Sequence, residues 1–400
     1  MRSVGSMLSL AGGLLAAILG GCSPAPDSSP PSRSAAASIA PARAAQSGSQ
    51  AFLSLLKLEA AGRIIGPHSA EAARRELSAI LNHRTRDYKI AGSGTNVRIW
   101  ASDSTDDYLL GMNWNGTKLV SAVNLASSSC YGPQSIKVDR GNNVWLACNY
   151  LTAGQTGAGL QEYDSSGTLQ NTYEFQSSAQ CPPGDSCNTW SPDGGWDNGG
   201  HVFAVMDGID YTNNRYLTPG FYWWNAGDPL ATPTFISAAP GCSGASCEVM
   251  HMDVDASGNL WYTFLASGGQ GLGEVTNPTT SPSAAVVLTA TGEYWDGVYA
   301  SRRGRVLNIV APQSRLIYQY QLPVTPSSTP INTLGPTPAT LSGRGSPLTG
   351  AFGAKDATIV LGDEYGWLDI GTVSSNTWQT ATGVNFYGGV FGAAYTPSDK

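Results

Sequence analysis

The chain has 400 residues, of which 41% are hydrophobic and only 13% charged, so it has ample apolar material for a large core. Its 48 glycines and many Ser, Thr, Asn, Trp and Tyr residues favour short strands joined by tight turns over long helices. Residues 57–98 carry eight Lys/Arg and four Asp/Glu, whereas residues 99–400 carry eleven and twenty-four. Because nucleic-acid binding depends on neutralising phosphates, this acidic main domain argues against a nucleic-acid partner.

The first residues predict an export signal. Arg2 precedes an apolar run over residues 7–19 that is too short to span a bilayer comfortably. Leu19-Gly20-Gly21-Cys22 follows and resembles the bacterial lipobox, whose cysteine is lipidated and becomes the first residue after cleavage. The resemblance implies a signal peptide over 1–21 and attachment to a membrane through a lipid anchor at Cys22. Ser23 resembles the sorting pattern for the outer membrane, facing the periplasm or the surface. The alternative is an ordinary secretory signal with an incidental cysteine.

Two further segments precede the main domain. Residues 22–50 are rich in Ser, Ala and Pro and have few large apolar side chains, so we expect a disordered tether. Residues 51–88 predict a helical segment that Gly66-Pro67 divides, with Ser69 as the N-cap of the second helix. Such a pair of helices packs on the neighbouring domain, and recruitment of a partner is the alternative.

Residues 89–400 contain internal repeats, which define the expected fold. Residues 136–145 and 252–261 describe the same β-hairpin, in which a strand ends at Asp, a turn contains Gly-Asn and the next strand opens on Trp. Residues 298–307 are a weaker copy. Units of about 40–60 residues with about four strands each predict an all-β fold, a six-bladed β-propeller. Seven blades is the alternative count and a β-sandwich the alternative fold. The expected blades are 90–128, 129–180, 195–240, 246–291, 292–345 and 346–386.

The last residues predict how the ring closes. Residues 387–400 are too few for another blade. The missing strands must therefore come from the start of the domain, near Val97–Ala101 and Tyr108–Trp114, so that the C-terminal strand closes the propeller and removes exposed sheet edges.

The D-x-x-G-N-x-W pattern at Asp255–Trp261 resembles the repeats of NHL-type propellers, streptogramin lyases and gluconolactonase (regucalcin-like) proteins. The resemblance covers under a fifth of the chain and is specific for architecture, not for one activity. In gluconolactonase-like enzymes a Glu, an Asn and an Asp hold a divalent cation. Asp296-Gly297 resembles that family's Asp-Gly entrance, with Glu248 or Glu293 as the acid, but no Asn matches. For a lyase, His251 is the candidate general base.

The six cysteines that follow Cys22 are an even number, as expected of disulfides in an exported protein. The spacings predict Cys130–Cys148, Cys181–Cys187 and Cys242–Cys247. Because the chain lacks Cys-x-x-Cys and His-Glu-x-x-His, the sequence does not support a zinc or haem site.

Eight residues lie at or just before predicted strand entrances and are the candidate ligand site: Trp196, Asp197, Glu248, His251, Glu293, Trp295, Asp296 and Tyr387. We expect them around the channel mouth where the inner strands start, with aromatic rings for apolar contact and carboxylates as acceptors. A water-filled channel is the alternative. The sequence thus predicts a cell-envelope lipoprotein that binds a protein, peptide or sugar ligand and needs no cofactor. The alternative is a lactonase- or lyase-type enzyme dependent on Ca²⁺ or Mg²⁺.

Overall fold

The computed structural model of the protein describes residues 97–103, 107–151, 157–176, 180–210, 212–213, 215–238, 247–266, 269–290, 292–301, 303–337, 347–353, 356–363, 367–382, 390 and 392–396. By its contacts the chain divides into Met1–Thr85 and Arg86–Lys400, and every described residue belongs to the second unit. The predicted signal peptide, tether and helical segment lie outside the described residues. Those residues contain no α-helix and one 3₁₀ turn, η1 (Leu125–Ser128).

The described strands form six antiparallel sheets, which we number as blades in chain order. Blade 1 contains β26 (Ala393–Tyr395), β1 (Ile99–Asp103), β2 (Tyr108–Met112) and β3 (Leu119–Asn124). Blade 2 contains β4 (Tyr131–Val138), β5 (Val144–Tyr150), β6 (Gly157–Tyr163) and β7 (Leu169–Gln176). Blade 3 contains β8 (Cys187–Trp190), β9 (Gly194–Trp196), β10 (His201–Asp210), β11 (Arg215–Tyr216), β12 (Gly220–Asn225) and β13 (Thr234–Ser237).

The other three blades have four strands each. Blade 4 contains β14 (Cys247–Val254), β15 (Leu260–Ala266), β16 (Gly269–Thr276) and β17 (Ser283–Ala290). Blade 5 contains β18 (Val298–Ala300), β19 (Val306–Ala311), β20 (Leu316–Gln321) and β21 (Asn332–Leu334). Blade 6 contains β22 (Pro347–Phe352), β23 (Thr358–Asp363), β24 (Trp367–Thr372) and β25 (Thr377–Thr380).

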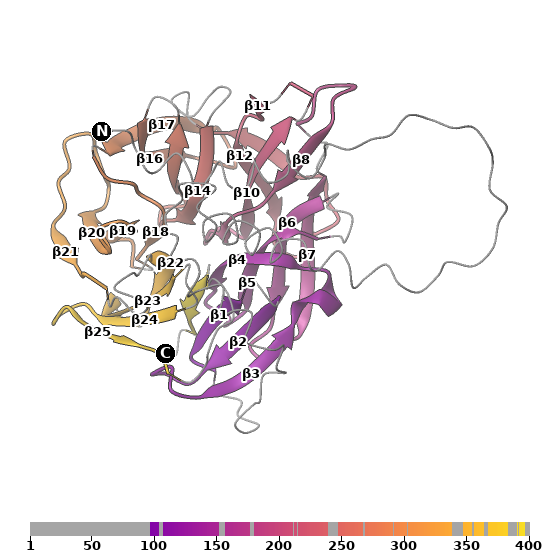
Figure 1. The fold of residues 1–400 in the computed structure, drawn as a ribbon. Coiled ribbons are helices and arrows are strands. Elements are labelled where there is room, and N and C mark those ends of the chain that lie inside the picture. Colours follow the sequence, from indigo (N-terminus) through magenta and orange to yellow (C-terminus); the bar gives the residue numbers. More distant parts are fainter. Residues whose placement is uncertain are drawn as a thin grey trace, which may run out of the picture. The chain divides into compact units, whose positions relative to one another are not determined.

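The innermost strands of the six blades form a closed ring. β4 contacts β9, and the contacts continue through β14, β18, β22 and β26 back to β4. Figure 1 shows the sheets following one another around this centre. The predicted six-bladed β-propeller is therefore confirmed. One expected boundary is wrong: blade 3 begins at Cys187 and not near residue 195, because β8 and β9 both pair with β10 as one interrupted inner strand.

The core lies between the blades. Among the described residues, six apolar clusters each join two neighbouring blades. Alternate side chains of a strand point to opposite faces of its sheet. On β15, Tyr262 accordingly packs toward blade 3 and Trp261 toward blade 5. Central strands such as β15 are therefore nearly all apolar, whereas the outer strand β17 retains exposed positions.

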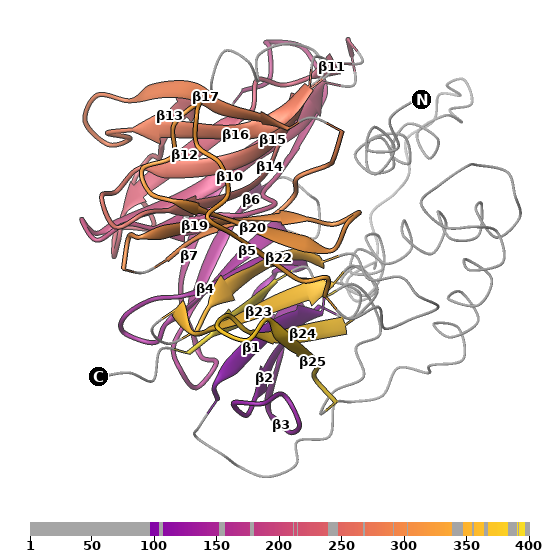
Figure 2. The same cartoon turned by 90° about the vertical axis from the view of Figure 1, so that its left-hand side faces the viewer.

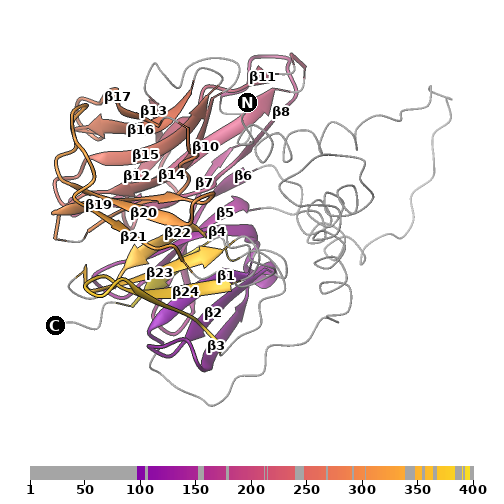
Figure 3. The ribbon, with the colours of Figure 1, turned by 60° about the vertical axis from the view of Figure 1, so that its left-hand side comes forward.

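The C-terminal strand lies in the same sheet as the first strands of the domain. β26 pairs with β1 in the register Ile99 with Tyr395 and Trp100 with Ala394. Figures 2 and 3 show the C-terminal strands of blade 6 beside the strands β1 and β2. Blade 1 thus combines both ends of the described chain.

Two predicted disulfides are confirmed. Cys130 is bonded to Cys148 and Cys181 to Cys187, with Cα–Cα distances of 5.3 and 5.8 Å. Cys247 is also disulfide-bonded, and Cys242, its expected partner, lies outside the described residues. Disulfides of this kind are typical of exported proteins.

Candidate functional site

One aspartate in the turn explains the sequence of the repeated hairpins. In blade 4 the carboxylate of Asp255 accepts hydrogen bonds from the backbone N–H groups of Ser257 and Asn259, at 2.8 and 3.0 Å, and from Nε1 of Trp261 at 2.9 Å. Asp139 makes equivalent contacts to the turn backbone and the following tryptophan in blade 2. The motif therefore fixes the turn and satisfies a buried indole N–H.

Asp197, one of the predicted ligand residues, is the equivalent turn aspartate of blade 3. Its carboxylate accepts a hydrogen bond from the backbone N–H of His201 at 2.8 Å and lies 2.7 Å from Nδ1 of the same residue. Residues 197–201 are thus a third copy of the turn, with His201 where the other two copies have Asn. Asp197 closes a hairpin and does not join the charged groups described next.

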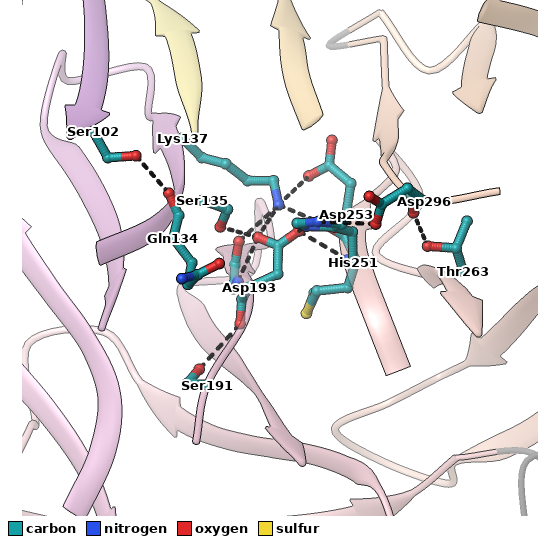
Figure 4. Close-up of polar contacts among 12 residues, drawn as sticks. Ser102, Gln134, Ser135, Lys137, Ser191, Asp193, His251, Asp253, Thr263 and Asp296 are labelled. Carbon is teal, nitrogen blue, oxygen red and sulfur yellow. Dashed lines mark hydrogen bonds and ion pairs between the residues drawn. The ribbon is translucent and has the colours of Figure 1, made fainter. Parts of the chain in front are cut away.

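Five charged side chains from four blades meet at the centre of the ring (Figure 4). We name them the central charge cluster: Lys137 on β4, Asp193 between β8 and β9, His251 and Asp253 on β14, and Asp296 before β18. Two of them, His251 and Asp296, were predicted as ligand residues. The structure brings this pair together, with Nε2 of His251 3.3 Å from Oδ1 of Asp296.

Asp193 holds the cluster together. Its carboxylate accepts hydrogen bonds from the hydroxyl of Ser135, from Nζ of Lys137 at 2.7 Å and from the backbone N–H of Met252 at 2.9 Å. Its Oδ2 also lies 3.1 Å from Nδ1 of His251. Burial alone would raise the pKa of Asp193, but the charge of Lys137 and the contact with His251 outweigh it and hold the pKa at about 2.

Every nitrogen of the Lys137 and His251 side chains lies against buried acceptors. Lys137 donates to Asp193 and to the carbonyl oxygens of Gly194 and Met252, which accounts for the three hydrogens of an ammonium group. Burial alone would lower the pKa of His251, but its hydrogen bonds to Asp193 and Asp296 outweigh it and raise the pKa to about 9. His251 is therefore a cation near neutral pH.

Asp253 has the weakest ion pairing of the three aspartates in the cluster. Its Oδ2 accepts a hydrogen bond from the backbone N–H of Ala300 at 2.7 Å, and its Oδ1 accepts one from that of Val254 at 2.9 Å. Its ion pair with Nζ of Lys137 spans 3.9 Å, and 16% of its side-chain surface is exposed. Burial raises the pKa of Asp253, opposed by the charge of Lys137.

A pocket of about 70 Å³ lies against the cluster, at the mouth where the inner strands end. The last residues of β4, β14, β18 and β22 line it, and we name it the strand-end pocket. Its chemically distinctive lining residues are Lys137, Arg140, Trp196, Asp253, Asp255 and Phe352. Lys137 and Asp253 belong to both the cluster and the pocket, so the cluster forms the base of the pocket.

The remaining predicted ligand residues lie elsewhere. Trp295 is buried in the apolar cluster between blades 4 and 5. Glu293 accepts a hydrogen bond from the hydroxyl of Tyr318 at 2.6 Å. Glu248 lies near the start of β14, close to Asp207. The pKa of Asp207 is raised well above its usual range, first because the carboxyl group is buried and second because Glu248 is negatively charged.

Of the eight predicted residues, Trp196 lines the pocket, and His251 and Asp296 belong to the cluster beneath it. Tyr387 lies outside the described residues. Lys137, Asp193 and Asp253 are not among the eight predicted ligand residues.

Neither a metal site nor a membrane span is found in the described part of the chain. Those residues include no group of three or more His, Cys, Asp or Glu side chains placed to hold a metal ion. They also include no helix long and apolar enough to cross a membrane. The carboxylate of Asp296, which the metal-enzyme alternative requires, faces the imidazole of His251.

Fold and site together define a six-bladed β-propeller with a charged, aromatic pocket at one end of its ring of inner strands. No protein-family model and no curated protein sequence matches the chain. The similar solved structures include a nidogen/laminin complex, with a TM-score of 0.49 and 9% identity over 76% of this chain and 100% of that one.

Two bacterial propellers are also similar. The periplasmic gluconolactonase of Pseudomonas aeruginosa has a TM-score of 0.46 and 11% identity over 71% of this chain and 81% of that one. The calcium-binding protein regucalcin of Agrobacterium tumefaciens has a TM-score of 0.41 and 14% identity over 70% of this chain and 79% of that one. Propellers of the types that the hairpin repeats resemble are thus among the similar solved structures.

Proposed function

We propose that the protein is an exported, lipid-anchored binding protein whose propeller holds a small ligand in the strand-end pocket. The pocket itself carries this proposal, because Arg140, Asp253, Trp196 and Phe352 converge around about 70 Å³. One water molecule needs roughly 10–15 Å³. The pocket therefore has room for a small molecule or for the head group of a larger one. A few charged groups set among aromatic rings are typical of ligand sites.

The central charge cluster supports binding over catalysis. Lys137 and His251 already donate their hydrogens to buried acceptors, so neither supplies a general base without breaking a buried ion pair. Breaking such a pair costs about 3–5 kcal/mol. The cluster thus holds the base of the pocket in one geometry, which lowers the entropic cost of binding.

A ligand screen tests the binding function. The purified protein is tested by thermal unfolding against amines, carboxylates, sugars and short peptides. We expect at least one class to raise the melting temperature of the wild type but not of Trp196→Ala, because Trp196 lines the pocket. Trp114→Ala is the matched control, since Trp114 is 70% exposed and does not line the pocket. An equal response in Trp196→Ala, or no response from any class, contradicts the proposal.

The lipid anchor is tested separately. We expect cells fed a labelled fatty acid to incorporate it into the wild-type protein but not into Cys22→Ser, because the thiol of Cys22 is the predicted attachment point. Detergent should be needed to extract the wild type, whereas the variant should be recovered without it. Label in the Cys22→Ser protein would show that this cysteine is not the anchor.

A further inference from the structure

The strand-end pocket has four charged side chains in its lining, and two of them are already held by other groups. Lys137 donates its three hydrogens to Asp193 and to two backbone carbonyl oxygens. The carboxylate of Asp255 is held by the turn of blade 4 and by the indole of Trp261. Each oxygen of Asp253, at the base, accepts one backbone hydrogen bond and so retains acceptor capacity for a ligand, and Arg140 is exposed at the rim.

The buried charges beneath the pocket do not balance. Lys137 and His251 supply two positive charges, whereas the three aspartates supply three negative charges when all are ionised. Asp193 is paired with both cations, and Asp296 is paired with His251. The excess negative charge therefore falls on Asp253, whose ion pair is the longest of the set at 3.9 Å. Asp253 is also the only carboxylate of the cluster that lines the pocket among the described residues.

We infer that the ligand of the strand-end pocket is a small organic cation, an amine or a quaternary ammonium, whose positive charge is held by Asp253. This inference rests on the proposed binding function and names the class of its ligand. A bound ammonium group supplies the positive charge that the cluster lacks, next to the carboxylate where the excess lies.

The aromatic lining selects an organic cation over a metal ion. Trp196 and Phe352 both line the pocket, and an ammonium group is attracted to the face of an aromatic ring within about 6 Å. Calcium, in contrast, takes about 6–8 oxygen ligands. Asp253 alone offers a carboxylate there that is not already held by a turn.

Titration calorimetry with ethanolamine and choline tests the inference, with acetate, glucose and calcium chloride as comparison probes at constant ionic strength. We expect the two cations to bind the wild type and the comparison probes not to bind. Asp253→Asn should weaken cation binding by about tenfold or more, since a contact to a charged group is stronger than one to a neutral group. Asp228→Asn is the matched control, because Asp228 is exposed in the turn between β12 and β13.

A second pair of variants tests the inference in case Asp253→Asn does not fold. Arg140→Glu changes an exposed rim charge and should strengthen the binding of choline by roughly three- to tenfold, because a like charge is replaced by an attractive one. Arg305→Glu changes the net charge equally at an exposed position that does not line the pocket, so it should leave the affinity within a factor of two.

The outcomes separate the two proposals. Binding of a sugar or carboxylate that needs Trp196, without binding of either cation, overturns the inference but leaves the binding function standing. The inference is also overturned if calcium binds in a way that needs Asp253 while neither ethanolamine nor choline binds. Weaker choline binding in Arg140→Glu contradicts the assigned charge of the ligand. If no compound of the broader screen binds, the binding function fails with the inference.

Discussion

The carboxylate of Asp193 joins three neighbouring blades. It accepts hydrogen bonds from Lys137 in blade 2 and lies against His251 in blade 4, while its own backbone lies between two strands of blade 3. Asp296 extends the network to blade 5. Because removing one member leaves another charge buried and unpaired, the cluster fixes the inner strands around the pocket.

His251 makes the stability of the propeller depend on pH. Its folded pKa of about 9 lies above the ordinary value of about 6.5, so the folded state favours the protonated ring. The resulting stabilisation is fully present below about pH 6.5 and is lost as the pH rises through the folded pKa. We expect urea unfolding to show the free energy of unfolding falling by up to about 3 kcal/mol over this range.

The His251→Gln variant isolates this effect. It should unfold more easily than the wild type at pH 6.5 but lose little further stability on the alkaline side. His201→Gln is the matched control, because His201 lies in a hairpin turn outside the cluster, and it should keep the alkaline fall. The same alkaline fall in His251→Gln and in the wild type would show that another group causes it.

Individual site residues were only partly predictable. The Asp-Gly dipeptide at a strand entrance points to Asp296, and the same dipeptide occurs at Asp193-Gly194. Lys137 and Asp253 each lie two residues before a turn aspartate, so the hairpin repeat places them at equivalent positions of β4 and β14. That they approach each other across blade 3 depends on the radius of the ring, which the sequence pattern does not give.

At the scale of elements, the hairpins were predictable because their determinants are local. The pattern of Asp, Gly, Asn and Trp within ten residues encodes the turn, its hydrogen bonds and the tryptophan at the second position of the next strand. All three predicted copies are hairpins: β4–β5, β14–β15 and, for the weaker copy, β18–β19. The further copy of the turn at Asp197 does not match the sequence pattern, because His201 replaces the usual Asn.

The interrupted strand of blade 3 was not predictable in the same way. β8 and β9 are separated by three residues, which include Asp193, and each pairs with a different part of β10. Local periodicity is lost at this interruption, so the sequence pattern places the start of the blade near residue 195 and not at Cys187. The interruption places the carboxylate of Asp193 among the groups from blades 2 and 4.

At the scale of the whole molecule, six blades followed from the spacing of the repeats. The spacing does not predict which mouth of the ring carries the pocket, because both ends of the inner strands carry polar and aromatic residues. The predicted ligand site lies at the mouth where these strands start, whereas the strand-end pocket lies at the opposite mouth.

The pairing of β26 with β1 gives the last residues a role in the stability of the whole domain. Ala393 and Ala394 are fully buried, and they pack into the apolar clusters on the two sides of blade 1. Gly392 lies so close to β4 that a Cβ atom there would be 2.3 Å from the carbonyl oxygen of Gln134. The strand therefore contacts blade 2 as well as its own sheet.

Deleting residues 387–400 should destabilise the entire propeller. The deletion exposes the edge of β1, removes backbone hydrogen bonds worth about 1 kcal/mol each, and opens both blade interfaces. We expect the melting temperature, followed by circular dichroism, to fall by roughly 10 °C or more in one cooperative transition, because each interface depends on the next around the ring. A deletion of residues 397–400 alone is the control, since it keeps all of β26, and it should melt like the full-length protein. If the longer deletion also melts like the full-length protein, the C-terminal strand does not stabilise the ring.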